Sequence, residues 1–101
     1  MFALDRNLEY GGFERLAVSN TAVGLASIPS DVPIVLVQVD IESNNIRFRA
    51  DGTDPTATVG TLAQVDQVLW MDGNSDEWTS FRAIRESSDA VLSVTYWKQA
   101  D

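Results

Sequence analysis

The sequence predicts an all-β domain, a small antiparallel β-sandwich or barrel of about six to eight short strands with an extended N-terminal arm. Segments that alternate apolar and polar residues recur along the chain, and clusters of turn-forming residues separate them roughly every ten residues. One of these segments, residues 33–42, has the β-branched composition of a central strand. No segment has the apolar spacing of a long helix.

Length and composition place the chain among folded single domains. Its 101 residues suffice for one modest hydrophobic core. Hydrophobic residues make up 45% of the chain and charged residues 22%, a balance that is typical of globular rather than disordered proteins. We therefore expect one domain over residues 13–101, preceded by an arm over residues 1–12.

Membranes and nucleic acids are not expected partners. The chain lacks the run of about 18 apolar residues that a membrane-spanning helix needs, and its first residues do not resemble a signal peptide. Synthesis in the cytoplasm is therefore expected. Seven Lys and Arg oppose 15 Asp and Glu, and the net charge of −8 repels phosphate backbones.

Catalysis and cofactor binding are not expected either. Cysteine and histidine are absent, so the chain lacks a thiol nucleophile, the usual general base and the ligands of soft metals. The carboxylate pairs Asp51 with Asp54 and Asp76 with Glu77 are best interpreted as solvated surface groups, because so short a chain leaves little room for a glycosidase cleft.

The N-terminal part of the chain is weakly patterned. Residues 1–12 are expected to form an extended arm or a loosely held first strand that ends at the breaker Gly11-Gly12. Residues 13–19 are expected to form a strand and residues 23–25 a short one.

Residues 33–42 give the strongest strand signal of the chain. The odd-numbered side chains from Val35 to Ile41 share a face that stays apolar, whereas the opposite face becomes polar toward Glu42. Because Asn tolerates left-handed geometry, residues 43–45 predict a tight connection and an antiparallel hairpin between this strand and the one that starts at Ile46.

Residues 46–62 predict a strand, a tight polar turn and a return toward the core. Ile46, Phe48 and Ala50 fall on one face of the strand, and Arg47 and Arg49 on the other.

The turn itself is predicted by four residues. Gly52 accepts a positive φ, and the side chain of Asp51 can bond its own backbone two residues on. Pro55 lacks an N–H and moves Asp54 toward extended geometry. We interpret all four as structural turn residues.

A calcium loop is the alternative interpretation of this turn. Asp51, Asp54 and the hydroxyl of Thr53 or Thr56 would then supply hard oxygen ligands. The EF-hand pattern, in which the last loop position is a bidentate Glu, is absent, so the plain turn is favoured.

The remaining residues predict three more strands. Residues 61–70 predict a strand with a corner at Val65-Asp66, and residues 67–71 are its regular part. Residues 72–76 predict a turn. Residues 78–85 predict a strand with imperfect alternation. Residues 91–97 close the fold, with the odd-numbered and even-numbered side chains on opposite faces.

Aromatic and basic residues are the candidates for an interaction surface. Trp70 and Trp97 are expected in the core or at a subunit contact, whereas Trp78 follows a polar loop and is expected to be the most exposed. If their segments pair, the arginines are expected to contact Asp40, Glu42 or a neighbouring subunit. The possible interface consists of Arg47, Arg49, Trp78, Arg82 and Arg85.

Three segments of the C-terminal half have distinctive sequences. They are Arg-Phe-Arg-Ala-Asp-Gly-Thr-Asp-Pro-Thr-Ala-Thr-Val-Gly (47–60), Phe-Arg-Ala-Ile-Arg (81–85) and Leu-Ser-Val-Thr-Tyr-Trp (92–97). In this order and spacing they resemble a group of small structural proteins of tailed bacteriophages and prophages. The resemblance covers the C-terminal half well and the N-terminal third only by general pattern.

The resemblance implies a protein of the virion, in the first place a capsid decoration protein on the outer surface of the head. Its partner would be the major capsid protein or another virion protein, and by analogy it would be a homotrimer. A neck, head–tail joining or tail component is the alternative of the same class. The segment Asp-Gly-Thr-Asp-Pro-Thr also resembles a turn of immunoglobulin-like modules in carbohydrate-active enzymes. An alternative of another class is therefore a carbohydrate-binding module that uses Trp78.

Overall fold

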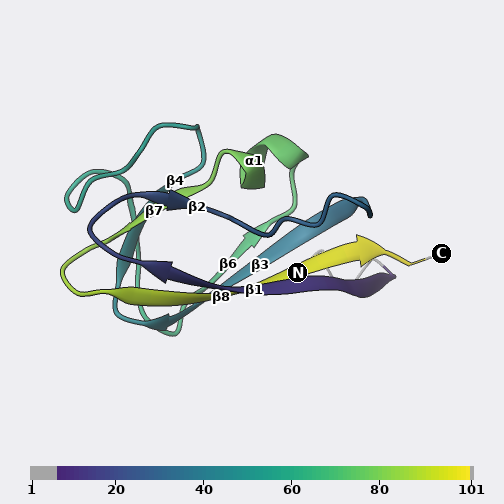
Figure 1. Cartoon of the computed structure of the whole chain (residues 1–101), viewed down its shortest axis with the longest axis horizontal. Helices are drawn as coiled ribbons and strands as arrows, with labels where there is room; N and C mark the ends of the chain where they lie inside the picture. The colour runs from purple at the N-terminus through teal and green to yellow at the C-terminus, as the bar shows by residue number, and fades with distance from the viewer. Residues whose placement is uncertain (1–6, 101) are drawn as a thin grey trace.

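Two antiparallel sheets of four strands each form a β-sandwich in the computed structural model, which describes residues 7–100 (Figure 1). The all-β prediction and the predicted number of strands are confirmed. The first sheet has the strand order β1 (Leu8–Val18), β8 (Ala90–Gln99), β3 (Ile34–Ser43) and β6 (Val68–Met71). The second sheet has the order β2 (Val23–Gly24), β7 (Arg82–Arg85), β4 (Ile46–Arg49) and β5 (Thr61–Ala63).

The core lies between the two sheets and follows from the alternation of each strand. On β3 the inward side chains are Val37, Val39 and Ile41, as predicted, and each is at most 1% exposed. On β8 the even-numbered side chains point inward, and Tyr96 is fully buried. The second sheet contributes the ring of Phe48, which stacks on that of Phe81 with 5.6 Å between the ring centroids.

Strand β1 continues through Gly11 and Gly12, so the predicted break at these glycines is wrong. A β-bulge between Tyr10 and Gly12 absorbs one extra residue in the pairing with β8. A Cβ on Gly11 would lie 3.1 Å from the side chain of Ile34, and one on Gly12 would lie 3.0 Å from that of Pro29. Glycine is therefore suited to these positions because other side chains lie close to the backbone, and it does not interrupt the strand. Of the predicted arm, residues 1–6 lie outside the described residues.

The predicted hairpin between residues 33–42 and the strand at Ile46 is also wrong. β3 pairs with β6 and β8 in the first sheet, whereas β4 pairs with β5 and β7 in the second. The chain crosses between sheets at Asn44, which has a φ of 59°, and its side-chain amide donates to the carbonyl of Asp89. The other predicted corner, at Val65-Asp66, is confirmed: Asp66 has a φ of 72°, and the chain passes from β5 to β6.

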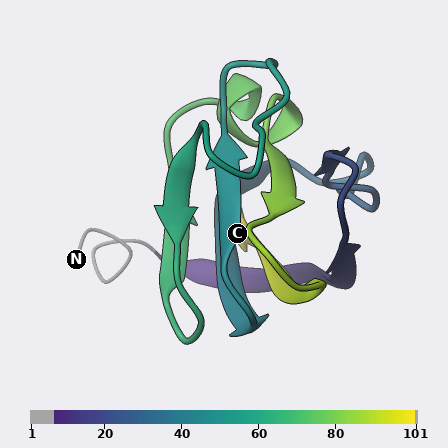
Figure 2. The ribbon, with the colours of Figure 1, turned by 90° about the vertical axis from the view of Figure 1, so that its left-hand side faces the viewer.

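A short helix replaces part of the strand predicted over residues 78–85. The helix α1 (Ser75–Thr79) begins at Asn74, whose side chain accepts a hydrogen bond of 3.0 Å from the N–H of Asp76. α1 and the loop 50–60 lie on the same side of the molecule (Figures 1 and 2). Among the described residues, no helix is long and apolar enough to cross a membrane.

A buried carboxylate holds the loop between β2 and β3 against β1. Glu14 is 8% exposed and accepts hydrogen bonds from the N–H groups of Ala26 (3.0 Å) and Ser27 (2.8 Å). Its Oε2 also accepts a hydrogen bond from the hydroxyl of Tyr96. Burial, the hydrogen bond to Glu14 and the charge of Glu14 raise the pKa of Tyr96 above its ordinary range.

Candidate interaction surface

The predicted turn after β4 is confirmed. Gly52 has a φ of 82°, and the Oδ1 of Asp51 accepts a hydrogen bond of 3.2 Å from the N–H of Thr53. Pro55, which belongs to the same loop, is buried. Asp54 pairs with Arg82 at 2.7 Å, which ties the loop 50–60 to β7. The alternative calcium ligands Asp51 and Asp54 are thus both held by arginines.

The four arginines of the predicted interface each contact an acid of the same chain. Arg49 pairs with Asp51 at 2.5 Å, and Arg85 pairs with Asp89 at 2.6 Å. The hydrogen bond and charge of Arg49 hold the pKa of Asp51 below its usual range. The predicted contacts with Asp40 or Glu42 are wrong, because β3 belongs to the other sheet.

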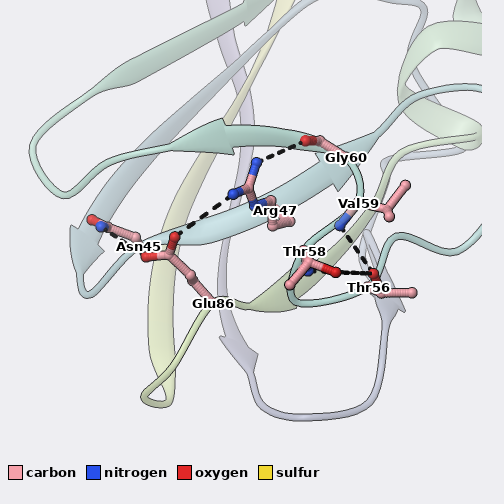
Figure 3. Close-up of polar contacts among 7 residues, drawn as sticks. All are labelled: Asn45, Arg47, Thr56, Thr58, Val59, Gly60 and Glu86. Atoms are coloured by element: carbon pink, nitrogen blue, oxygen red, sulfur yellow. Dashed lines mark hydrogen bonds and ion pairs between the residues drawn. The ribbon is translucent and has the colours of Figure 1, made fainter.

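Arg47 is the most enclosed of these arginines (Figure 3). Its Nη1 donates to the carbonyl of Gly60 at 3.1 Å, and its Nη2 lies 3.8 Å from a carboxylate oxygen of Glu86. In the same loop, the hydroxyl of Thr56 accepts a hydrogen bond of 2.9 Å from the N–H of Val59. Arg47 therefore acts as a support for the end of the loop.

The prediction that Trp78 is the exposed tryptophan is wrong. Trp78 is 3% exposed and belongs to the core cluster, because α1 turns this residue inward from the polar loop that precedes it. A strand over residues 78–85 does not predict this burial, because Trp78 belongs to the helix. Trp78 is therefore removed from the interface, and Trp70, at 37% exposed, takes its place as an exposed tryptophan.

The outer face of the first sheet carries most of the exposed aromatic side chains. We call it the aromatic face, defined by Tyr10, Phe13, Val68, Trp70 and Trp97. Tyr10 is 61% exposed and Phe13 is 52% exposed, and both lie on β1. The strand register places Trp97 opposite Tyr10, on the side away from the buried Tyr96. Sequence alternation had indicated this face of β8, but not that it stays open to solvent.

A line of polar groups orders the centre of the aromatic face. The Nε1 of Trp97 donates to the Oε1 of Gln38 at 3.1 Å. The Nε2 of Gln38 in turn donates to Asp40, with 3.2 Å to Oδ2. In the strand register, Gln38 lies opposite Trp70 and Asp40 lies opposite Val68. The carboxylate of Asp40 is thus oriented beside an apolar strand.

The charges of the two sheets differ in how they are compensated. All four ion pairs among residues 7–100 involve the arginines of β4 and β7. On the aromatic face, Asp40 binds the amide of Gln38, and Glu42 accepts a hydrogen bond from the hydroxyl of Ser93. Within the described part of the chain, neither carboxylate forms an ion pair, although Arg15 lies on the same face opposite Ser93.

Two surface depressions are lined in part by acidic side chains of α1. One, of about 570 Å³, is lined by Asp51, Asp76 and Glu77, among others. Asp51 is bound to Arg49, and Glu77 accepts a hydrogen bond of 2.9 Å from the N–H of Gly73. A second depression, of about 470 Å³, lies between β4 and β6 beside Trp70. Within the described range, no three acidic side chains gather as a metal site would require.

Comparisons with models of protein families, with curated proteins and with solved structures give no match for this chain.

Proposed function

We propose that the chain is a structural protein of a tailed-phage virion, and specifically a decoration protein that binds the outer surface of the head. The observation that carries the proposal is the aromatic face: Tyr10, Phe13 and Trp70 are exposed together on one side of the first sheet. Exposed aromatic groups on one patch are typical of protein contact surfaces.

The segments that resemble phage proteins support the same proposal. Residues 47–49 and 82–85 pair as adjacent antiparallel strands, and Arg49 lies opposite Arg82. The arginines of these segments serve the fold, since they bind Asp51, Asp54, Glu86 and Asp89. These two segments therefore support the fold, whereas the third, residues 92–97, belongs to β8 and contributes Trp97 to the aromatic face.

Binding to a shell would act by adding contact area. A standard protein interface removes about 800 Å² from each partner, roughly one seventh of the 5531 Å² surface of this chain. A copy that bridges neighbouring capsid subunits must be released before the subunits separate, so it stabilises the assembled shell. A homotrimer at a local three-fold position is the proposed assembly, with the major capsid protein as partner and the virion as location.

The copy number of the chain in purified particles tests the proposal. Quantitative mass spectrometry would compare it with the major capsid protein. A ratio near one, or one per few capsid subunits, supports decoration. A handful of copies per particle would instead favour a neck, head–tail joining or tail component. Absence of the chain from particles would contradict the virion proposal.

The exposure of Trp70 favours a carbohydrate-binding module as a second candidate function. A sugar ring stacks on an exposed indole, and the neighbouring Gln38 and Asp40 offer hydrogen-bonding groups. Trp78 cannot play this role, because that side chain is buried. Tryptophan fluorescence that is unchanged by oligosaccharides, together with a glycan array without hits, would remove this candidate.

A further inference from the structure

We infer that the aromatic face docks on a basic protein surface, and that Asp40 and Trp70 together receive a cationic side chain of that partner. The inference deepens the proposed function and rests on it for the identity of the partner, the shell protein of the head. It assigns the binding role to the first sheet rather than to the arginines of the second.

The apolar part of the docking surface spans the first sheet. Phe13, Thr95, Gln38 and Trp70 occupy one register row across β1, β8, β3 and β6. Since neighbouring strands lie about 4.8 Å apart, Phe13 and Trp70 are about 14 Å from one another. Two large apolar side chains at that separation, with Trp97 and Tyr10 beside them, make a broad contact area.

The carboxylate of Asp40 is preorganised within this area. Gln38 holds it with its side-chain amide, and Gln38 is itself held by the indole of Trp97. Trp70 lies diagonally across the strand pair from Asp40, within reach of a shared ligand. A carboxylate next to an indole face suits a guanidinium or ammonium group, which gains an ion pair and a cation–π contact together.

Charge decides what kind of partner fits. Asp40 and Glu42 outnumber the one cation of this part of the face, Arg15, which lies opposite Ser93 in the register row of Asp40 and Val68. No described cation forms an ion pair with either carboxylate. A second copy of this chain, docked face to face, would bring two further carboxylates against these two, which one Arg15 from each copy offsets only in part. It would also meet the repulsion between two chains that each carry a net charge of −8. A basic partner removes both costs.

The test uses shells assembled from the major capsid protein without this chain. Purified chain would be added at increasing concentration, and the bound fraction would be measured by co-sedimentation. The two test variants are Trp70→Ala and Asp40→Asn. The matched controls are Val59→Ala, which removes another exposed apolar group, and Arg82→Gln, which removes a charge from the second sheet. Urea denaturation would verify that every variant is folded.

We expect Trp70→Ala to weaken binding by about 30-fold or more, as truncation of an interface hot spot does. Asp40→Asn should weaken binding by about fivefold, and this effect should shrink as salt is raised. Both controls should bind like the unchanged chain. A carbodiimide should link Asp40 or Glu42 to lysines of the shell protein.

The outcomes that overturn the inference differ from the one that overturns the proposed function. If the unchanged chain does not bind shells, the proposed decoration function is contradicted, and with it the docking of the aromatic face on the shell protein. Shell binding that is insensitive to Trp70→Ala and Asp40→Asn overturns the inference alone. Loss of a solution dimer in Trp70→Ala would assign the face to a second copy, and loss of glycan binding would assign it to a carbohydrate. Either result overturns the inference.

Discussion

The hydroxyl of Tyr96 donates a hydrogen bond to the carboxylate of Glu14 inside the sandwich, although the two residues are 82 positions apart in the chain. The same carboxylate accepts hydrogen bonds from the backbone at Ala26 and Ser27. One buried anion thereby joins β1, β8 and the loop that leads to β3. These hydrogen bonds link two strands of the first sheet from its inner side. The aromatic face lies on the outer side of the same sheet.

Replacing Glu14 is expected to destabilise the fold strongly. Glu14→Gln replaces one accepting oxygen by an NH₂ group, which cannot accept the hydrogen bonds that Ala26, Ser27 and Tyr96 donate. We therefore predict a loss of about 2–4 kcal/mol in the free energy of unfolding. Urea denaturation would measure it. The exposed Glu42→Gln serves as the control and should change stability by less than about 0.5 kcal/mol. A double-mutant cycle with Tyr96→Phe should give a coupling energy of about 1 kcal/mol or more, and additive effects would contradict the pairing.

The raised pKa of Tyr96 predicts a loss of stability at alkaline pH. The folded-state pKa lies above the unfolded value of about 10, so the contribution is complete below pH about 10 and falls as pH rises further. Above pH about 10, Tyr96 lowers the free energy of unfolding by about 1.4 kcal/mol per pH unit. Denaturation curves at increasing pH should show this slope in the unchanged chain and not in Tyr96→Phe. Equal slopes in both would contradict the prediction.

Trp78 and Trp70 should respond in opposite ways to truncation. Trp78→Ala removes a core side chain and should cost about 3–5 kcal/mol of unfolding free energy. Trp70→Ala should cost about 1 kcal/mol or less, because the side chain is 37% exposed. Acrylamide should quench the fluorescence of Trp70 and leave that of Trp78 protected. Comparing the quenching of Trp70→Ala and of Trp78→Ala with that of the unchanged chain would show this. Reversed costs would mean that the burial of the two residues is interchanged.

Gly52 should tolerate few replacements. Nothing lies within 4 Å of a Cβ placed there, so the cost of Gly52→Ala comes from its φ of 82° alone. We expect a loss of about 1 kcal/mol in the free energy of unfolding, and a smaller loss for Gly52→Asn, since Asn adopts left-handed geometry more readily. Thermal denaturation of both variants would check the order, and a harmless Gly52→Ala would contradict the turn geometry.

The arginine pairs of the second sheet should matter little for stability. The acids Asp54 and Asp89 are 61% and 71% exposed in their pairs, so Asp54→Asn and Asp89→Asn should each cost less than about 1 kcal/mol. The difference should decrease in high salt because exposed pairs are screened. Unfolding measurements at low and high salt would decide. A loss of several kcal/mol would show that these pairs are structural anchors.

The sequence predicted what depends on local geometry. The alternation of residues 35–41 and 91–97 identified the inward faces of β3 and β8, because side chains of a strand must alternate. Asp51 and Gly52 marked a turn through their own backbone preferences. The corner before β6 was indicated in the same way.

The features that sequence reasoning missed depend on contacts between distant segments. Asn44 suits both a hairpin and a corner, and only its bond to the carbonyl of Asp89 selects the corner. Glu14 is a charged residue inside the strand predicted over residues 13–19, and nothing in its neighbourhood in the sequence indicates that it points inward, because its donors come from another loop and from β8. Trp78 and Trp70 carry the same apolar signal, and α1 alone decides which one is buried.

Electron cryo-microscopy of the decorated particle tests the central claim most directly. The account predicts density for this chain on the outside of the shell in many copies. The outer face of the first sheet should point toward the capsid protein, with Trp70 and Asp40 in the contact. A particle without this density, or a copy that meets the shell through the arginines of β4 and β7, would contradict it.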